Sequence, residues 1–485
     1  MFFDRKSHQY SWGILFLSIA VALLLGLLFW NSRPQNVHAE TMGAYNESNT
    51  ITTKPKSDHV VFLPIVLSNY TPPVQSIFGI QTYGALNSPA AAITLAQEAH
   101  VRWVRTDIAW SAIEFTNTVP GNYNFSGYDL SILAAKQAGF EPVVTIIGNP
   151  SWAATYPQGP IDKVPLSKFT DFISAVVTRY NGDPASGAPG APEVVYWEFY
   201  NEPDNSSRIS AGKGLAGYWG NYGAEYAQML CAVYPVVKAA NPRARVVIGG
   251  LAYDWFEDQG GPFVREFLDN VLAAGGGQCF DVMNFHYYPA FASYWAPYGP
   301  GLSGKANYLR SKLSQYGLSK PMICTEAGWP SDIYGSTPEI QTQYVVKLFT
   351  QSRASRLDNM MWWTWIDPGP NYGAFGLLTQ ALERKPSFYG YKVAAEKIGS
   401  AIFNRALSAT ELGNSAMEGY LFTLNSKPLY VLWSNDGVAR TVRIALPRAR
   451  LTDLYGTDMG TINAEGDGYI HLPVGTNPIY VEGLP

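Results

Sequence analysis

Between residues 76 and 400 the chain alternates short apolar runs, rich in Val, Ile and aromatic residues, with longer stretches whose apolar positions recur at helical spacing. The apolar runs predict eight strands, at 76–84, 101–110, 141–149, 194–203, 244–252, 280–289, 321–330 and 360–368. The stretches between them predict helices, among them 90–100, 127–139, 166–180, 222–240, 262–274, 305–316, 338–356 and 385–399.

Near-continuous apolar strands that alternate with helices are typical of a parallel sheet covered by helices. Eight such units predict an α/β fold, a (β/α)8 TIM barrel at 76–400. A doubly wound open sheet is the alternative fold. No Gly-rich phosphate loop follows the first predicted strand, and this weakens the nucleotide-binding form of that alternative.

The hydrophobic pattern changes beyond residue 400. Short strands are predicted at 419–424, 428–434, 441–446, 450–455, 468–473 and 477–482. The turn residues Asn435-Asp436-Gly437 favour a hairpin between two of these strands. We therefore expect a small β-sandwich domain at 401–485, packed against the barrel.

The N-terminal region 1–39 predicts a transmembrane anchor or a signal peptide. Residues 12–30 carry no charge, and Arg5 and Lys6 precede them. The length of the apolar run favours an anchor, whereas Val37-His38-Ala39 would serve as a signal-peptide cleavage site. Either reading places the rest of the chain outside the cytoplasm, membrane-anchored or secreted, with 40–75 as a linker or stalk.

The composition excludes some classes of function. The net charge of −4 gives no basic excess for nucleic-acid binding, and three Cys in 485 residues exclude a disulfide-scaffold protein. Cys231 and Cys279 could pair, and two-residue alternation predicts that Cys324 shares the face of Glu326 and is buried and inert. The Cys and His spacing matches no metal motif, so we expect neither a metal nor another cofactor.

Two glutamates follow predicted strands at positions where barrel enzymes have their catalytic residues. Glu202 lies in Asn201-Glu202-Pro203 after the fourth strand, and Glu326 follows Thr325 after the seventh. Catalytic groups of barrel enzymes lie at the C-terminal ends of strands. A pair of carboxyl groups there can cleave a glycosidic bond. The alternative is that each glutamate caps a helix or pairs with an arginine of the barrel.

On these residues the chain resembles glycoside hydrolase clan A, the retaining (β/α)8 glycosidases, over roughly 76–400. Asn201-Glu202-Pro203 matches the motif of the general acid/base, and Glu326 matches the nucleophile. Other strand ends match as well: Arg105 on strand 2, His286 and Tyr288 on strand 6, and Trp365 on strand 8. Within the clan the pattern is nearest to families 39 and 5, and family 39 also carries a trailing β-sandwich.

The resemblance assigns roles to the two carboxyl groups. Glu326 must be ionised to attack the anomeric carbon, and Arg105 together with the Tyr288 hydroxyl would favour that form. Glu202 must hold its proton, and burial and the charge of Glu326 would raise its pKa. Asn201 would hydrogen-bond the sugar 2-hydroxyl.

The remaining matched residues are expected to bind substrate. His286 would bind the sugar and Trp365 would form the floor beneath it. The competing interpretations are that Arg105 neutralises Glu198, that His286 is structural, and that Trp365 belongs to the core.

We therefore expect a retaining glycoside hydrolase that acts outside the cytoplasm on a β-linked poly- or oligosaccharide. A transglycosylase on the same scaffold is one alternative. A non-catalytic carbohydrate-binding barrel is another, and a structural envelope protein is a third. Turnover of a glycan, as opposed to binding alone, discriminates the enzymes from the other two.

Overall fold

The computed structural model describes residues 75–84, 90–117, 121–206 and 218–485. The N-terminal anchor or signal peptide and the linker expected to follow it lie outside these residues, apart from residue 75. Within these ranges, no helix combines the length and the apolar character that crossing a bilayer requires.

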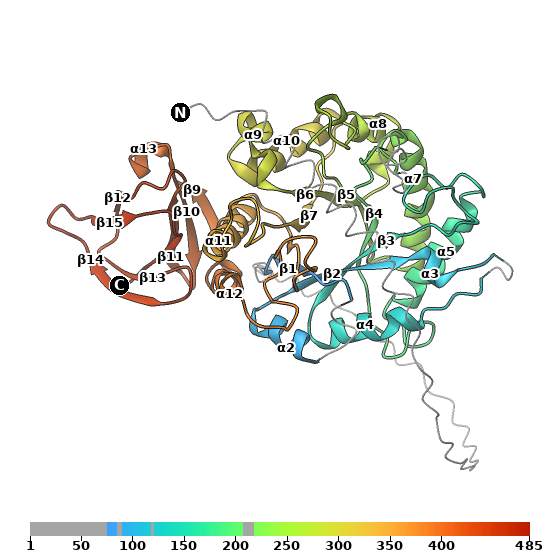
Figure 1. Cartoon of the computed structure of the whole chain (residues 1–485), viewed down its shortest axis with the longest axis horizontal. Helices are drawn as coiled ribbons and strands as arrows, with labels where there is room; N and C mark the ends of the chain where they lie inside the picture. Colours follow the sequence, from blue (N-terminus) through green and yellow to red (C-terminus); the bar gives the residue numbers. More distant parts are fainter. Residues whose placement is uncertain (1–74, 85–89, 118–120, 207–217) are drawn as a thin grey trace, which may run out of the picture.

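The larger domain is a parallel eight-stranded sheet whose order is β5-β4-β3-β2-β1-β8-β7-β6 (Figure 1). Its strands are β1 Phe78–Gln81, β2 Trp103–Ala109, β3 Glu141–Ile147, β4 Tyr196–Asn201, β5 Arg245–Gly250, β6 Met283–Tyr287, β7 Met322–Ala327 and β8 Met360–Trp362. Isolated parallel bridges from Val247 to Val282 and from Leu251 to Phe285 join β5 to β6. The sheet therefore closes on itself, and the predicted (β/α)8 barrel is confirmed.

Helices surround the strands on the outside (Figure 1). The main ones are α2 Ala90–Glu98, α4 Ser126–Gln137, α5 Ser167–Arg179, α7 Gly223–Ala240, α8 Phe267–Ala273, α10 Gly301–Gln315, α11 Pro338–Ala354 and α12 Pro386–Ile398. Shorter elements lie in the loops: α3 Trp110–Ile113, η2 Glu257–Gln259, η3 Gly276–Gln278, η4 Pro289–Phe291, α9 Ala292–Trp295 and η5 Ala296–Tyr298.

Helix α5 illustrates why these sequences cover the barrel. Its buried residues are Phe169, Phe172, Ile173, Val176 and Val177, which recur at helical spacing on one face. Each such side chain contributes about 1.5–3 kcal/mol when it leaves water. This layer between strands and helices is the main hydrophobic core.

Successive strand residues face opposite sides of the sheet, so every second side chain points into the barrel. The inward-facing side chains of neighbouring strands form layers. An apolar layer includes Trp103, Val143, Met361, Val247, Val282 and Ile323. Two residues further along four of these strands lie Arg105, Thr145, Asn284 and Thr325, all buried and polar. The barrel is thus apolar towards the N-terminal ends of its strands and polar towards their C-terminal ends.

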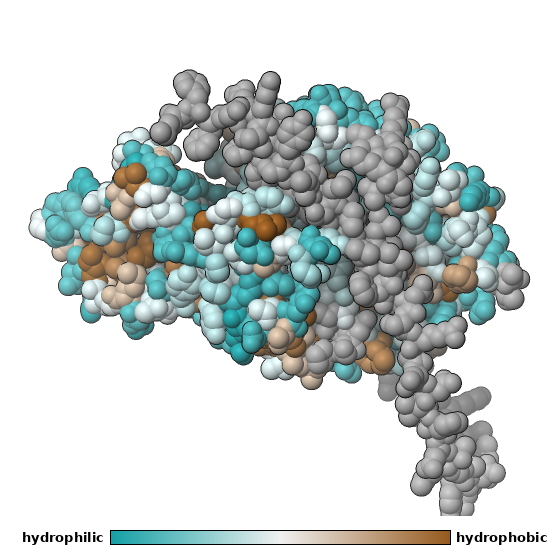
Figure 2. Space-filling view, in the orientation of Figure 1, coloured by the Kyte–Doolittle hydropathy of each residue, from teal (hydrophilic) through white to brown (hydrophobic). Residues whose placement is uncertain are grey.

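The C-terminal domain is the expected β-sandwich, and it lies beside α11 and α12 (Figure 1). A six-stranded sheet of order β14-β13-β16-β11-β10-β9 packs on the β12-β15 pair. Its elements are β9 Ile402–Ala406, α13 Ala409–Leu412, β10 Met417–Leu424, β11 Lys427–Ser434, β12 Arg440–Ile444, β13 Arg448–Thr452, β14 Asp458–Asn463, β15 Ile470–Val474 and β16 Ile479–Gly483. On the face in Figure 2, the coloured residues are mostly hydrophilic, with hydrophobic ones in small separate groups.

One turn prediction in this domain is wrong. The strands on either side of Asn435-Asp436-Gly437 belong to different sheets, so this turn is a crossover and not a hairpin. Arg440 holds it by donating to both carboxylate oxygens of Asp436 at 2.7 and 2.6 Å. The hairpin joins β10 to β11 through Asn425 and Ser426, both with positive φ. Strands β9 and β14 were not predicted.

Cys231 of α7 and Cys279 form a disulfide, with their Cα atoms 4.8 Å apart. The pairing that the sequence left open is therefore present. The bond ties α7 to the segment that leads into β6.

Candidate active site

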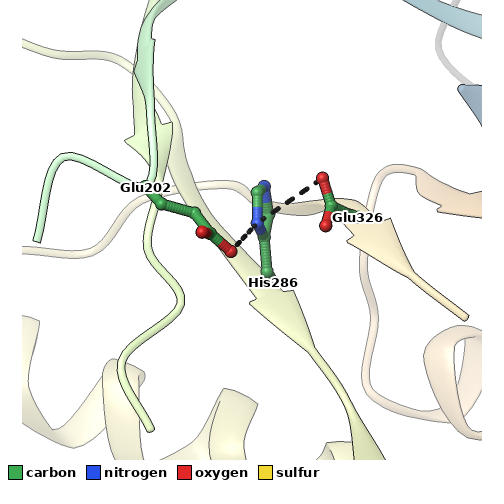
Figure 3. Close-up of side chains that lie close together, drawn as sticks. All are labelled: Glu202, His286 and Glu326. Atoms are coloured by element: carbon green, nitrogen blue, oxygen red, sulfur yellow. Dashed lines mark hydrogen bonds and ion pairs between the residues drawn. The ribbon is translucent and has the colours of Figure 1, made fainter. Parts of the chain in front are cut away.

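Glu202 and Glu326 meet at the C-terminal end of the barrel. One carboxylate oxygen of each and a ring nitrogen of His286 all lie within 4.8 Å of one another. Figure 3 shows the two carboxyl groups approaching the imidazole from opposite sides. Both glutamates and His286 are buried.

The backbone at the end of β4 turns Glu202 into the barrel. Tyr200 and Glu202 have φ values of 64° and 44°, in the left-handed region that non-glycine residues seldom adopt. Such a conformation costs on the order of 1–3 kcal/mol and persists only where neighbouring contacts hold it. The Tyr200 hydroxyl donates to Asn149 Oδ1 at 2.7 Å, and the Glu202 amide donates to the Gly250 carbonyl at 3.1 Å.

Gly250 at the end of β5 makes room for the site. A Cβ at this position would lie 2.1 Å from Nε2 of His286. Only glycine therefore lets the imidazole lie against β5 and reach Glu202.

A register shift in β7 brings Glu326 into the barrel. Phe285 pairs with Cys324, but the next residue of β6, His286, pairs with Glu326. Thr325 is the extra residue, and its side chain also faces the interior, where it contacts Asn284. The expected alternation is therefore wrong: Cys324 does not share the face of Glu326 but lies in the outer core. Cys324 is buried, and burial raises the pKa of its thiol to about 12.

Arg105 lies within β2, not at its end, and it is the central cation of the site. It donates to both carboxylate oxygens of Glu198 at 2.9 Å, in the bidentate geometry that carboxylates favour. Its Nη1 lies 3.4 Å from Glu326 Oε2, and its Nη2 donates to Asn201 Oδ1 at 2.7 Å. The two interpretations of Arg105 therefore hold together: it neutralises Glu198 and also contacts Glu326.

Sequence reasoning recognised Glu198 only as a partner for Arg105. Its carboxylate also accepts from Thr145 Oγ1 at 2.8 Å, from the Gly250 amide at 2.9 Å and from Asn284 Nδ2 at 2.9 Å. Glu198 precedes Glu202 by four residues on an apolar strand. An acidic residue inside an apolar strand could have indicated this role, since a buried carboxylate requires several partners.

The strand 6 residues contact both carboxyl groups. The Tyr288 hydroxyl donates to Glu326 Oε1 at 2.7 Å. His286 Nδ1 lies 3.1 Å from Glu202 Oε1 and 3.9 Å from Glu326 Oε2. Burial, reinforced by Arg105 and Lys305, lowers the pKa of His286 well below its ordinary value, so the imidazole is neutral.

The two glutamates differ in their surroundings. Burial raises the pKa of Glu202 far above its ordinary value, and the charge of Glu326 raises it further. Burial also raises the pKa of Glu326, to about 7, although Arg105 and the Tyr288 hydroxyl lower it. The cation and the phenol thus favour the ionised form at Glu326 and leave the proton on Glu202.

Glu202, His286 and Glu326 are also close enough to supply three ligands to a metal ion. Arg105 and Tyr288 already satisfy the two oxygens of Glu326. A guanidinium at 3.4 Å would repel a cation bound to the same carboxylate. The surroundings therefore fit a carboxyl pair better than a metal centre.

A second buried ion pair lies near Glu202. Lys305 Nζ is 3.1 Å from Asp254 Oδ2 and also donates to the Ala252 carbonyl. Asp204 accepts from the amides of Ala252 and Tyr253 at 3.2 and 2.6 Å. The negative charges of Asp204 and Asp254 also raise the pKa of Glu202. This group could not be predicted from the sequence, because Lys305 comes from α10, far along the chain.

Trp365 makes no contact with Glu202, His286 or Glu326 that the described residues show. It is fully buried, and its ring packs on Phe388 of α12 at a centroid distance of 5.9 Å. This position favours the core interpretation over a floor beneath the sugar. Two residues earlier, Trp363 donates to the hydroxyl of Tyr83, a residue that is 40% exposed. Burial raises the pKa of Tyr83, and the charge of Glu326 raises it further, so this aromatic pair lies near the carboxyl groups.

Known structures share this architecture. A family 39 glycoside hydrolase from Bacteroides cellulosilyticus WH2 aligns with 84% of this chain and 81% of its own, at 21% identity and a TM-score of 0.66. A GH30 endoxylanase from Clostridium papyrosolvens C71 aligns with 85% and 97%, at 13% identity and a TM-score of 0.58. A family 51 α-L-arabinofuranosidase from Bifidobacterium longum aligns with 85% and 97%, at 14% identity and a TM-score of 0.54.

These likenesses confirm, at the level of the fold, the resemblance to the clan A glycoside hydrolases. No protein-family model matches the chain, and no curated protein matches it in sequence. The fold is therefore shown, and the activity must be argued from the site.

Proposed function

We propose that the protein is a retaining glycoside hydrolase that cleaves a β-linked glycan through a glycosyl-enzyme intermediate. The observation that carries this proposal is the buried carboxyl pair Glu202/Glu326, of which one oxygen from each lies within 4.8 Å of the other and whose partners differ. Glycoside hydrolases among the structures of the same fold support it.

In the first step, Glu326 attacks the anomeric carbon while Glu202 gives its proton to the leaving oxygen. Arg105 and Tyr288 stabilise the carboxylate of Glu326 before the attack. The raised pKa of Glu202 keeps it protonated, as a general acid must be. The glycosidic bond breaks as the Glu326–sugar ester bond forms.

In the second step, water replaces the departed group. Glu202, now ionised, takes a proton from the water, whose oxygen attacks the anomeric carbon and releases Glu326. The two steps invert the centre twice, so the configuration is retained. The neutral imidazole of His286, 3.1 Å from Glu202, positions that carboxyl group through both steps.

The separation of the carboxyl groups supports retention over inversion. Inverting enzymes hold them about 6.5–9.5 Å apart to admit water between them, whereas retaining enzymes hold them about 5–5.5 Å apart. An oxygen–oxygen approach within 4.8 Å leaves little room for an interposed water. Asn201 supplies the contact to the sugar 2-hydroxyl, and we assign the aromatic floor to Trp363 in place of Trp365.

Action outside the cytoplasm belongs to the same proposal. The Cys231–Cys279 disulfide supports it, because disulfides persist mainly in oxidising compartments.

The test is turnover by the full-length protein of aryl β-glycosides, β-glucan and xylan oligosaccharides, with Glu202→Gln and Glu326→Gln beside it. We expect Glu326→Gln to lose hydrolysis of every substrate and Glu202→Gln to lose hydrolysis of the oligosaccharides, whose leaving oxygens need a proton. With the wild type, proton NMR should show the β-anomer as the first product. Glu114→Gln is the matched control, because Glu114 is a buried glutamate bonded to the Trp110 indole. An α-anomer formed first would contradict retention. Binding without turnover would favour the non-catalytic barrel, and products longer than the substrate would favour transglycosylation.

A further inference from the structure

Gln81, the last residue of β1, is a fully buried side chain that sequence reasoning did not select. Its Oε1 accepts from Arg105 Nη1 at 3.4 Å. Its Nε2 has no hydrogen-bond partner in the part of the chain that the structure describes. The backbone beneath it is held in place, since the Gln81 carbonyl accepts from the Trp365 amide at 3.0 Å and from Thr364 Oγ1 at 3.2 Å.

Arg105 decides which way this amide faces. A guanidinium has five N–H donors and no acceptor, so only the carbonyl oxygen of a primary amide can face it favourably. Gln81 must therefore direct its NH2 group away from Arg105. Asn201 is held in the same way: its Oδ1 accepts from Arg105 Nη2 at 2.7 Å, and its Nδ2 is likewise without a partner among the described residues.

One guanidinium thus contacts two amides and also two carboxylates, those of Glu198 and Glu326. Nη1 contacts both Gln81 Oε1 and Glu326 Oε2, each at 3.4 Å. Gln81 therefore lies beside Glu326, the proposed nucleophile.

A buried N–H group without a partner costs about 1–3 kcal/mol. A ligand that brings hydroxyl acceptors to this part of the site would supply both amides with the partners that they lack. A sugar ring carries neighbouring hydroxyl groups that meet this requirement.

We propose that Gln81 is a specificity-determining residue, whose Nε2 donates a hydrogen bond to a hydroxyl of the glycone other than the 2-hydroxyl assigned to Asn201. This inference rests on the proposed glycosidase function and adds a recognised group to it. Arg105 acts as the positioning residue that holds both amides ready for the sugar.

The test combines a variant with altered substrates. Gln81→Met keeps the length of the side chain but removes the amide. Wild type and Gln81→Met are compared on the aryl β-glycoside that the wild type hydrolyses best, and on its 3-, 4- and, where present, 6-deoxy analogues. Gln343→Met is the matched control, because Gln343 lies on α11 and bonds Asn477 of the sandwich, away from the site.

We expect Gln81→Met to lower kcat/KM about 10- to 100-fold on the parent glycoside. On one deoxy analogue the two proteins should have the same kcat/KM, because each lacks one partner of the same hydrogen bond. Gln343→Met should match the wild type on every substrate.

Two results would overturn the assignment of Gln81: an unchanged kcat/KM on the parent, or an equal loss on every analogue, which indicates a general structural effect. Absence of turnover by the wild type on all substrates would instead overturn the proposed function and the inference that rests on it. The failures of the two proposals are thereby distinguishable.

Discussion

The Tyr288 hydroxyl donates a 2.7 Å hydrogen bond to Oε1 of Glu326, the glutamate on the neighbouring strand that also meets Arg105. A phenol aimed at a carboxylate stabilises its ionised form. The two glutamates therefore differ in their partners: Glu326 accepts from a phenol, whereas Glu202 lies beside the neutral imidazole of His286.

Removing this hydroxyl should shift the acid limb of the pH–rate profile. In Tyr288→Phe, loss of the donor raises the pKa of Glu326, so the acid limb of kcat/KM moves to higher pH. We expect kcat to fall about 10- to 100-fold, as for loss of a hydrogen bond to a charged group. Steady-state kinetics from pH 4 to pH 9 measure both effects. Tyr298→Phe, at an exposed tyrosine, should retain the wild-type profile, and an unshifted limb in Tyr288→Phe would count against the role of Tyr288.

The general-acid role of Glu202 predicts a dependence on the leaving group. In Glu202→Ala, a glycoside with a poor leaving group should lose about 10²–10⁴-fold in kcat/KM, because its departing oxygen needs a proton. A dinitrophenyl glycoside, whose leaving group departs without protonation, should lose far less. A plot of log kcat/KM against leaving-group pKa should therefore be steeper for the variant. Equal slopes in the two proteins would refute this assignment.

Burial of Glu202 predicts a pH-dependent stability. Its folded-state pKa is raised above the unfolded value, so the folded state binds the proton more tightly. Its contribution to stability is fully present below the unfolded pKa, near 4.3, and declines as pH rises towards the folded pKa.

Glu202→Gln, which resembles the neutral carboxyl at every pH, should accordingly lose less unfolding free energy than the wild type between pH 5 and pH 8. Urea unfolding across this range measures the difference. The other buried acids remain in both proteins, so parallel curves would show that the pKa of Glu202 is not raised.

Removing one member of the Lys305–Asp254 pair should be strongly destabilising, since both members are buried and the remaining charge would lose its partner. Lys305→Met leaves the carboxylate of Asp254 without its cation and should cost about 3–5 kcal/mol of unfolding free energy. Adding Asp254→Asn should recover part of this loss. Arg450→Ala, which breaks the exposed pair with Asp458, is the matched control and should change stability by less than about 1 kcal/mol. If Lys305→Met and Arg450→Ala cost a similar free energy of unfolding, burial of the Lys305–Asp254 pair does not matter for stability.

Much of this protein could be predicted from hydrophobic periodicity. The eight strand–helix units, the change to short strands after residue 400 and the two strand-end glutamates were each visible in the sequence. Local backbone geometry was less predictable: the hairpin expected at Asn435-Asp436-Gly437 is a crossover between sheets, because strand partners are chosen by packing and not by the turn alone.

The sequence by itself determined which strands carry the candidate chemistry, since residue type and spacing are local properties of the chain. Only the tertiary structure decided which side chains meet. The register shift in β7 placed Glu326 beside His286 and moved Cys324 to the outer core. Arg105 brings together the amides of Gln81 and Asn201, which are 120 residues apart in the sequence. The physical reason is that a buried charge or polar group is costly without a partner, and most partners in this site come from strands distant in sequence.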